Sequence, residues 1–344
     1  MEQMIPIILD ENLQRVGMID FYRSFIWTER YNTPGDFEIV CPVTAALRSL
    51  VKLGRYVIRD DRQEVGIIET IRLTSEYNRG EHMALISGRF ASSILQRRIV
   101  DVTTKFKSKT AAQIIRQLVQ SHILSPSNSA RKIDIFDMDT TTVSGSRIKS
   151  AQFTGKNLLE VTESLCEEKG FGFRTYISGT GKITLHIYAG TDRRATAVFS
   201  PAFDNLNSEE YEESITARVT NVLTAGEGEG TARKTAWATV ENPTGLDRYE
   251  LYQDARNLRD DADDTAAYLE ELEQQGLEEI TPYTQAHMAE IAPGVLVYKQ
   301  DWDVGDIITI RNDVWGILET PRIVEVIESM DETGRYSITP SFAE

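Results

Sequence analysis

Short apolar runs separated by turn-forming residues dominate the first hundred residues. The runs are Met4–Leu9, Val16–Phe21, Phe37–Cys41, Tyr56–Ile58, Ile67–Leu73 and Met83–Ile86. This spacing is typical of strands in an antiparallel barrel or sandwich. One helix is expected at Val43–Lys52, because Pro42 stands at its start and Gly54 follows its end. We interpret this helix as a plug over a barrel mouth.

From about residue 105 the apolar residues recur at the spacing that is typical of helices. After Thr110, a candidate N-cap, the apolar residues at helical spacing are Ala111, Ile114, Ile115, Leu118 and Val119. A second helix is expected at Lys156–Lys169, where Gly170 ends it. The runs Phe171–Ile177 and Lys182–Tyr188 then flank a turn as a hairpin. These elements predict a small α/β domain.

Strand-like segments return beyond residue 201, at Ser214–Thr224 and Thr235–Val240, which the flexible Gly226–Gly230 joins. One long helix is expected at about 246–276, where Arg256 and Asp260, and Arg259 and Asp263, are spaced for ion pairs. The final fifty residues predict a β meander with strands Ile307–Ile310, Val314–Leu318, Arg322–Ile327 and Tyr336–Thr339.

These patterns predict an α+β fold class. Two antiparallel β-barrel domains are expected, at residues 1–104 and 201–344, with the α/β domain at 105–200 between them. The second barrel domain would carry the long helix.

The charge of the chain disfavours several classes of partner. Lys and Arg number 37 against 53 Asp and Glu, a formal charge of −16, which opposes sequence-independent binding to a phosphate backbone. No apolar run reaches the roughly 18 to 20 residues of a membrane span, so stable membrane insertion is not expected. Residues 1–4 carry no signal-peptide pattern. Cys41 and Cys166 are too few for a disulfide framework and are expected in the core.

None of the common catalytic constellations is recognisable. A P-loop at Gly155–Lys156 would need glycine at 150 and Ser or Thr at 157, and the chain has Ser150 and Asn157. Gly226–Gly230 lacks the third glycine of a dinucleotide fingerprint. The four histidines, His82, His122, His186 and His287, stand singly. We therefore expect no catalytic, cofactor-binding or metal-binding residues, no cofactor and no enzymatic activity.

Two groups of carboxylates are candidate cation sites. Asp260, Asp261, Asp263 and Asp264 would spread round the expected helix, so a solvated acidic face is favoured. Asp301, Asp303 and Asp306 lie in a loop-like order that could hold a cation, but turn and capping roles are favoured.

The sequence pattern of Trp27–Pro42 is a more specific indicator of fold than the overall composition. Alternation places Phe25, Trp27 and Tyr31 on one face, and Phe37, Ile39 and Cys41 on a matching face. Pro34-Gly35 fits a type II turn. We expect an aromatic-packed hairpin, with Arg30 free to stack or pair across an interface.

A second specific segment lies near the C-terminus. It runs from Tyr298–Asp306 through the strand Arg322–Val326 to the hairpin Asp331–Tyr336 and Phe342. Together the two segments resemble the family of siphovirus Gp37-like tail proteins named after the phage ReqiPepy6. The stretch from Leu158–Glu160 to Glu167–Phe171 also resembles the broader class of baseplate hub proteins of phage tails and related injection machines.

The resemblance implies a baseplate-hub-like homotrimer in a siphophage or prophage tail, with two tube-like β-barrels per chain. Six barrels in the trimer would match a sixfold tube. Its implied partners are the distal tail protein, the tail tube and tape measure proteins, and receptor-binding or tip proteins. Its implied location is the virion tail, assembled in the host cytoplasm.

The leading functional hypothesis is a structural hub ring that connects the tail tube and distal ring to the host-contacting tip and lets DNA pass. A trimer would carry 3 × −16 = −48, and an acidic channel offers no cations to hold phosphates. The alternatives are a tail-associated cell-wall hydrolase and a carbohydrate-binding tip module that uses Trp302 or Trp315.

Overall fold

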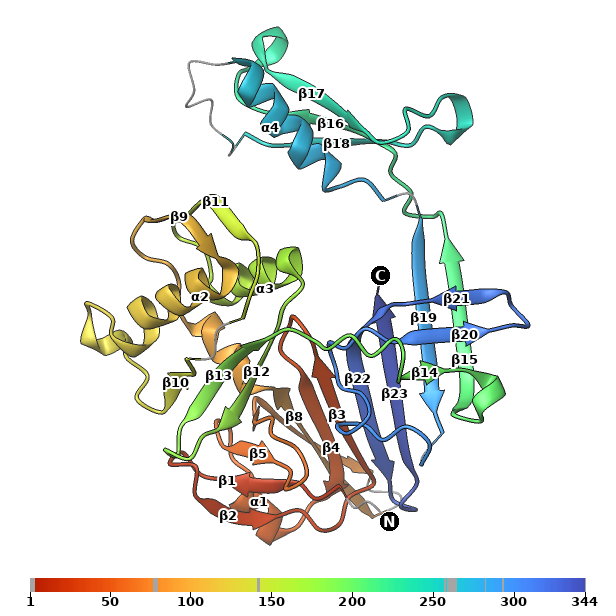
Figure 1. Ribbon diagram of the computed structural model, residues 1–344. Helices are drawn as coiled ribbons and strands as arrows, with labels where there is room; N and C mark the ends of the chain where they lie inside the picture. Colours follow the sequence, from red (N-terminus) through yellow and green to blue (C-terminus); the bar gives the residue numbers. More distant parts are fainter. Residues whose placement is uncertain are drawn as a thin grey trace. The chain divides into compact units, whose positions relative to one another are not determined.

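The computed structural model describes residues 4–76, 80–140, 143–256, 258, 265–281, 283–292 and 294–343. The chain forms two compact units, drawn in Figure 1. Unit 1 comprises Met1–Glu209 and Met288–Glu344, and unit 2 comprises Glu210–His287. This division differs from the expected boundaries at residues 104 and 200, and the three-domain organisation stays a prediction.

The largest sheet takes strands from both ends of the chain. Its order is β15-β19-β23-β22-β3-β4-β8-β7. The strands are β3 (Ser24–Arg30), β4 (Asp36–Pro42), β7 (Thr70–Glu76), β8 (Glu81–Arg89), β15 (Leu206–Ser214), β19 (Thr284–Ile291), β22 (Arg322–Asp331) and β23 (Tyr336–Ala343). β3 pairs antiparallel with β22, with Trp27 opposite Glu328. The terminal segments therefore share one sheet, and the strand orders of the described residues do not show the two closed barrels that were expected.

The β3–β4 hairpin confirms the expected aromatic packing. Trp27 lies opposite Phe37, Phe25 lies opposite Ile39, and all four side chains are buried. The expected type II turn is wrong, because Gly35 does not have the positive φ which that turn requires. A Cβ at Gly35 would lie 2.1 Å from the carbonyl oxygen of Thr28, so glycine is needed there for close packing.

A second sheet of unit 1, of order β2-β1-β5-β6, comes from the N-terminal segment. Its strands are β1 (Ile7–Leu9), β2 (Arg15–Met18), β5 (Tyr56–Ile58) and β6 (Gly66–Ile67). The helix α1 (Ala45–Leu50) is shorter than expected. Thr44 rather than Pro42 begins it, since the Thr44 side chain accepts the Leu47 N–H, and Pro42 belongs to β4.

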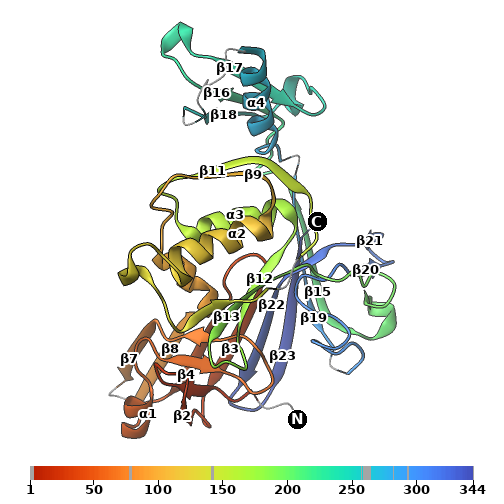
Figure 2. The same cartoon turned by 60° about the vertical axis from the view of Figure 1, so that its left-hand side comes forward.

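The segment from about 104 to 188 forms the helices and hairpin that the sequence predicts. The bounds are β9 (Thr104–Thr110), α2 (Ala111–Val119), β10 (Phe136–Met138), β11 (Arg147–Phe153), α3 (Leu158–Lys169), β12 (Gly172–Ile177) and β13 (Ile183–Tyr188). Thr110 and Gln113 form a capping box at the start of α2, and Gly170 ends α3 in the left-handed conformation. Figure 2 shows α2 and α3 side by side.

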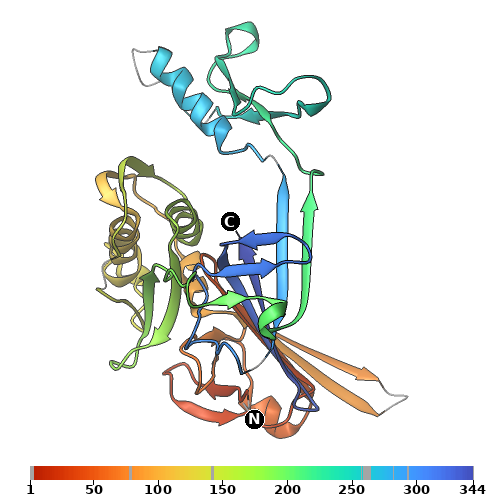
Figure 3. The same cartoon turned by 45° about the vertical axis from the view of Figure 1, so that its right-hand side comes forward.

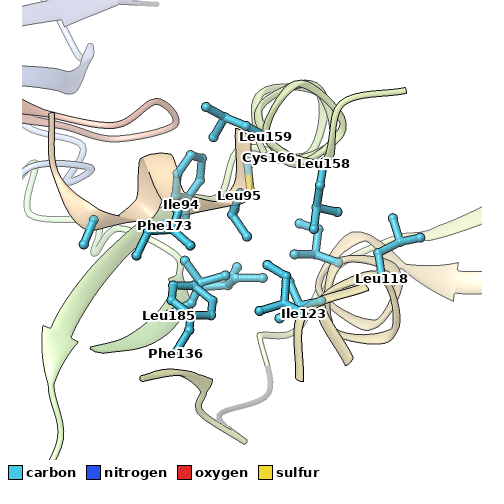
Figure 4. Close-up of a cluster of buried hydrophobic side chains, with 14 of the residues drawn as sticks. Ile94, Leu95, Leu118, Ile123, Phe136, Leu158, Leu159, Cys166, Phe173 and Leu185 are labelled. Carbon is cyan, nitrogen blue, oxygen red and sulfur yellow. The ribbon is translucent and has the colours of Figure 1, made fainter. Parts of the chain in front are cut away.

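One hydrophobic cluster holds this segment together. Ile94, Leu118, Leu158, Phe173 and Leu185 all lie within it, which joins α2, α3 and the β12–β13 hairpin to a 3₁₀ turn before them (Figure 4). The short helical turns of the chain are η1 (Ala91–Arg97), η2 (Gln120–Leu124), η3 (Ser129–Arg131), η4 (Pro201–Phe203), η5 (Gly230–Ala232) and η6 (Gly245–Asp247).

A small sheet of order β14-β20-β21 completes unit 1. Its strands are β14 (Val198–Phe199), β20 (Thr309–Asn312) and β21 (Ile317–Glu319). The turn between β20 and β21 is held by Asn312, whose Oδ1 accepts the N–H groups of Val314 and Trp315 at 3.0 and 3.1 Å. Asn312 therefore caps the turn that joins the two strands.

The described residues of unit 2 include a three-stranded sheet and the helix α4. The order is β17-β16-β18, with β16 (Asn221–Ala225), β17 (Thr235–Thr239), β18 (Glu250–Asp254) and α4 (Thr265–Leu277). The expected helix at 246–276 is wrong in its first part, because residues 250–254 pair with β16 as a parallel strand. Pairing with a neighbouring strand outweighed a weak local helical pattern. Of the expected ion pairs, Arg259, Asp260 and Asp263 lie outside the described residues, and Arg256 pairs with Asp254.

Candidate functional site

Unit 1 contains a network of charged side chains buried where segments from both ends of the chain meet. The carboxylates of Glu29 on β3, Glu64 before β6 and Glu328 on β22 are at most 2% exposed. Burying a carboxylate is costly unless cations and hydrogen-bond donors surround it. The network therefore has to be matched by positive partners.

Glu328 receives such partners from the loop that follows β5. The guanidinium groups of Arg59 and Arg62 both donate hydrogen bonds to its carboxylate. Arg62 Nε lies at 2.8 Å and Arg59 Nη1 at 3.2 Å. The Tyr336 hydroxyl donates to Glu328 Oε1 at 2.7 Å. Arg59 also binds Asp61, so this loop and β22 are held by several charge-assisted hydrogen bonds.

Glu29 and Glu64 are less completely matched. The ammonium of Lys299 lies 2.5 Å from Glu29, 2.9 Å from Asp303 and 3.6 Å from Glu64, so one cation serves three carboxylates. Arg174 adds a contact to Asp303 at 3.2 Å. With both carboxylates charged, Glu29 Oε1 and Glu64 Oε2 would have no hydrogen-bond donor among the described residues.

A proton held by Glu29 resolves this imbalance. Burial, and then the neighbouring carboxylate of Glu64, raise the pKa of Glu29 to about 8. Burial acts to raise the pKa of Glu64 as well, but the ammonium of Lys299 and a hydrogen bond from Glu29 outweigh it and lower that pKa. At neutral pH, Glu29 is therefore the protonated member of the pair.

This network stabilises the fold. Its carboxylates are buried and bind arginine, lysine and tyrosine side chains, so they are poorly placed to exchange protons with a substrate. It ties β3, β22, the residue 59–64 loop and the residue 299–303 loop into one body. We take it as the site that holds the two ends of the chain together.

Sequence reasoning missed this network, although part of its signal was present. Glu29 lies on the same face of the strand as the buried Phe25, Trp27 and Tyr31, because alternate residues of a strand share a face. Glu328 likewise shares a face of β22 with Val326 and Met330. A charged residue on an otherwise apolar strand face indicates a buried partner. The cationic partners Arg59, Arg62 and Lys299 lie in loops and carried no pattern.

Unit 1 also presents apolar side chains to solvent. Val16, Met18 and Phe21 are exposed beside a groove of about 370 Å³ between β2 and α1. Val314, Trp315 and Leu318 are exposed at the β20–β21 hairpin. Exposed apolar clusters of this kind mark interaction surfaces.

The edge strand β7 is a further exposed element. Its residues 72–75 are all exposed, including Leu73 at 46%. Figure 3 shows β7 and β8 as an orange hairpin that projects from the rest of unit 1. An edge strand offers unpaired backbone groups to another strand.

The candidate interface and sugar-binding residues Arg30, Trp302 and Trp315 differ in their exposure to solvent. Arg30 is not free for an interface, because it binds Asp36 and Glu325 at 2.6 Å each. Trp302 is fully buried and donates to the Leu296 carbonyl, so it cannot contact a sugar. Trp315 is half exposed.

Asp301 and Asp306 have the favoured turn roles, whereas the Asp303 carboxylate binds Lys299 and Arg174. Asp301 accepts the Val297 N–H at 2.7 Å, and Asp306 accepts the Asp303 and Thr191 N–H groups at 2.9 and 2.7 Å. Among the described residues, no group of three or more His, Cys, Asp or Glu could hold a metal ion. Asp260, Asp261, Asp263 and Asp264 lie outside those residues.

The histidines and cysteines do not converge. His122 is buried 3.2 Å from Asp101, His186 lies against Asp139 and stacks on Tyr188, His82 contacts Ser75, and His287 packs on Tyr211. Cys41 and Cys166 are buried in the core, as expected, and burial raises their thiol pKa values to about 11 and about 12. Both thiols are therefore protonated and inert at neutral pH.

The glycine-rich and lysine motifs are structural. Gly155 has a positive φ in the turn before α3, and Asn157 caps that helix. Gly226–Gly230 leads into a 3₁₀ turn, with Gly228 and Gly230 in positive-φ conformations. None of the helices in the described part of the chain is both long and apolar enough to cross a membrane.

Comparison with known proteins adds a family and a fold. The family model described as Siphovirus ReqiPepy6 Gp37-like protein matches residues 5–342. No curated protein matches the chain. The fold is similar to the 43 kDa tail protein of prophage MuSo2 from Shewanella oneidensis, at 14% identity and a TM-score of 0.61, over 99% of this chain and 98% of that one.

Two further solved structures are similar. The tail protein from Neisseria meningitidis MC58 has 11% identity and a TM-score of 0.60, over 100% of this chain and 97% of that one. A chain of the half-lidded Francisella PdpA-VgrG complex has 9% identity and a TM-score of 0.52, over 99% of this chain and 58% of that one. At these identities the likeness concerns the fold alone.

Proposed function

The chain belongs to the Siphovirus ReqiPepy6 Gp37-like family, and from this premise we propose that it is a structural, non-enzymatic hub of a phage or prophage tail tip. Three copies form a ring that connects the tail tube and distal ring to the host-contacting tip. DNA passes through the channel of this ring. The neighbours in the assembly are the distal tail protein, the tail tube and tape measure proteins, and the tip proteins.

The observation that carries this proposal is the likeness of fold, over nearly the whole chain, to two tail proteins. The arrangement of unit 1 supports it. A ring component has to transmit load between neighbours without opening. The buried network lies beside the pairing of β3 with β22, which joins residues 295 to 307 positions apart in sequence, and the bond from Arg30 to Glu325 spans the same two strands. Such a body is rigid because breaking one buried pair leaves an uncompensated charge.

The eight-stranded sheet supplies surfaces for ring closure. A cyclic trimer repeats one head-to-tail contact three times, so each chain needs two different complementary surfaces. The sheet has two edges, β7 and β15, and edge strands pair readily with strands of another chain. We assign β7 as one of the contact surfaces.

The test is the mass of the full-length protein by light scattering, followed by an image of the particle. We expect a trimer with threefold symmetry and a central channel. Leu73→Glu on β7 should shift the mass towards the monomer, because a buried carboxylate at the contact would be unpaired. A zymogram with peptidoglycan should show no clearing.

The matched control is Leu53→Glu, at a leucine that is 66% exposed and lies outside the sheets. It should leave the mass unchanged. A protein that is monomeric at every concentration, alone and with neighbouring tail proteins, would contradict the hub role. If Leu73→Glu and Leu53→Glu change the measured mass equally, β7 is not part of the contact between chains.

A further inference from the structure

A two-stranded ribbon of unit 1 presents a row of lysines to solvent. β9 pairs antiparallel with β11, and the ribbon lies beside α2 and α3 (Figure 2). Phe106 of β9 is buried and packs on Phe153 of β11, so the residues on either side of Phe106 point outwards. Lys105, Lys107 and Lys109 are all exposed, at a spacing of roughly 6.7 Å along the strand.

These three lysines have no anionic partner in the described part of the chain. The residues opposite them on β11 are Gln152, Ser150 and Ile148, which carry no charge. No carboxylate among the described residues forms an ion pair with any of the three ammonium groups. Like charges this close repel one another. The stability of the ribbon therefore does not explain the row.

The segment that contains the ribbon is basic, although the chain as a whole is acidic. Residues 97–156 contain 11 Lys and Arg against 4 Asp, a formal charge of +7, whereas the whole chain has −16. The aspartates of this segment all pair with other side chains; they are Asp101, Asp134, Asp137 and Asp139. A local charge so unlike that of the rest of the chain indicates contact with an anionic surface.

The helix α4 of unit 2 offers the complementary charge. Residues 210–287 contain 18 Asp and Glu against 6 Lys and Arg, a formal charge of −12. Glu270, Glu271 and Glu273 on α4 are exposed, and the helix has no lysine or arginine. None of the three glutamates forms an ion pair with a described residue. Glu278 follows the C-terminal end of α4, where the helix dipole disfavours an anion, so a cationic partner would stabilise this surface.

Charge complementarity selects a second copy of the chain as the partner. Nucleic acid and anionic lipid would have to approach a chain of net charge −16, which repels them at long range. In a ring, each copy brings one lysine row and one α4, so the two surfaces occur in equal number. We infer that the lysine row of β9 binds the glutamate face of α4 in a neighbouring copy. This inference rests on the ring proposed above and adds a second pair of surfaces to its head-to-tail contact.

The contact is compatible with a ring of acidic chains. Salt screens exposed charges that lie more than about 8 Å apart at physiological ionic strength, whereas partly buried pairs are screened much less. Lysine and glutamate side chains in contact therefore still attract one another where salt suppresses the repulsion between distant carboxylates.

A water-soluble carbodiimide, which joins ammonium and carboxylate groups in direct contact, tests the pairing in the full-length protein. Unlabelled and isotopically labelled chains are mixed at a dilution at which they exchange, and the cross-linked peptides are identified by mass spectrometry. We expect links between β9 lysines and α4 glutamates in which the two peptides differ in isotope. Links that always join peptides of the same isotope would place both surfaces in one chain and overturn the inference. A trimer without such links would overturn it too, and would leave the hub role standing.

Charge reversal gives a second test. Lys105→Glu with Lys107→Glu should raise the concentration of half-maximal trimer formation by about tenfold or more. Glu270→Lys with Glu273→Lys should have the same effect, although it makes the chain less acidic and would favour association if net charge alone decided. All four changes in one chain should restore association, because the contact is rebuilt with its charges exchanged.

The matched control is Arg48→Glu with Lys52→Glu, which changes the net charge as much as the lysine reversal does, at exposed residues outside the ribbon. It should raise the concentration of half-maximal trimer formation by less than about twofold. Circular dichroism checks that each variant is folded. Tighter association of the glutamate reversal, or no recovery in the fourfold variant, would overturn the inference.

Two further outcomes separate this inference from other readings. If the lysine reversal leaves the mass unchanged but abolishes retention of a DNA duplex, the row binds nucleic acid and the inference is wrong. A protein that stays monomeric at every concentration, alone and with neighbouring tail proteins, would overturn both this contact and the hub role.

Discussion

At the scale of single residues, two glutamates on apolar strand faces have unequal surroundings. Glu328 accepts hydrogen bonds from two arginines and a tyrosine. Glu29 has one strong cation partner, Lys299, which it shares with Glu64 and Asp303. The difference is that Glu29 gains its missing hydrogen bond from its own proton.

This proton makes stability depend on pH in a defined direction. The pKa of Glu29 is raised from 4.5 to about 8 in the folded chain. Its stabilising contribution is complete below about pH 4.5 and is lost as pH rises through about 8, at up to about 1.4 kcal/mol per pH unit. We expect Glu29→Gln to remove this decline, because an uncharged amide replaces the protonated acid. Denaturant unfolding between pH 4.5 and 8 measures it.

The comparison of the two proteins cancels other titrating groups. Burial lowers the pKa of His122, for example, which acts in the opposite direction in both. Glu38→Gln on the neighbouring strand β4 is the control, since this residue is only partly buried. If Glu29→Gln and Glu38→Gln have the same pH profile as the original protein, Glu29 does not hold the proton.

At the scale of elements, the β3–β4 hairpin depends on a close contact at its turn. A Cβ at Gly35 would lie 2.1 Å from the Thr28 carbonyl oxygen and 2.6 Å from the Phe90 ring. Phe90 in turn packs on Trp27, at 4.5 Å between ring centroids. The turn is therefore built into the core that the hairpin helps to form.

Gly35→Ala should destabilise the protein by about 1 to 3 kcal/mol, because the ring and the strand backbone must both move. Thermal or denaturant unfolding measures the change. Gly179→Ala is the control, since nothing lies within 4 Å of its Cβ position and its φ is not positive. A Gly35→Ala effect no larger than that of Gly179→Ala would mean that the close contact is relieved easily.

At the scale of the whole molecule, negative charge is unevenly distributed along the chain. Unit 2 has a formal charge of −12, and the remaining residues together have −4. Association of several copies brings these charges nearer to one another. Salt shortens the range of such repulsion to about 8 Å at physiological ionic strength.

We therefore expect added salt to favour the trimer. Sedimentation from low to high ionic strength measures the fraction of associated protein. A comparison of sodium chloride with an equal concentration of a neutral osmolyte separates screening from crowding. Dissociation of the ring by salt would mean that attractive ion pairs between chains outweigh the repulsion.

Local structure could be predicted where neighbours in sequence decide it. The capping box at Thr110, the left-handed Gly170 and the hairpin pairing of Trp27 with Phe37 all depend on residues within about ten positions of one another. The expected helix at 246–276 was wrong at residues 250–254. These residues form strand β18, and pairing with β16 sets their conformation. The buried network was missed, since Arg59, Arg62 and Lys299 lie in loops without a pattern.

The sequence by itself determined the periods, caps and turns, the acidic charge and the resemblance to a tail-protein family, because these depend on local composition and order. Only the tertiary structure decided that β3 pairs with β22, that Glu29, Glu64 and Lys299 meet in the core, and that Trp237 and Tyr252 share one face of the unit 2 sheet. The physical reason is that strand pairing and charge matching join residues far apart in the chain. Their free energy depends on which partners meet, and no local pattern specifies that.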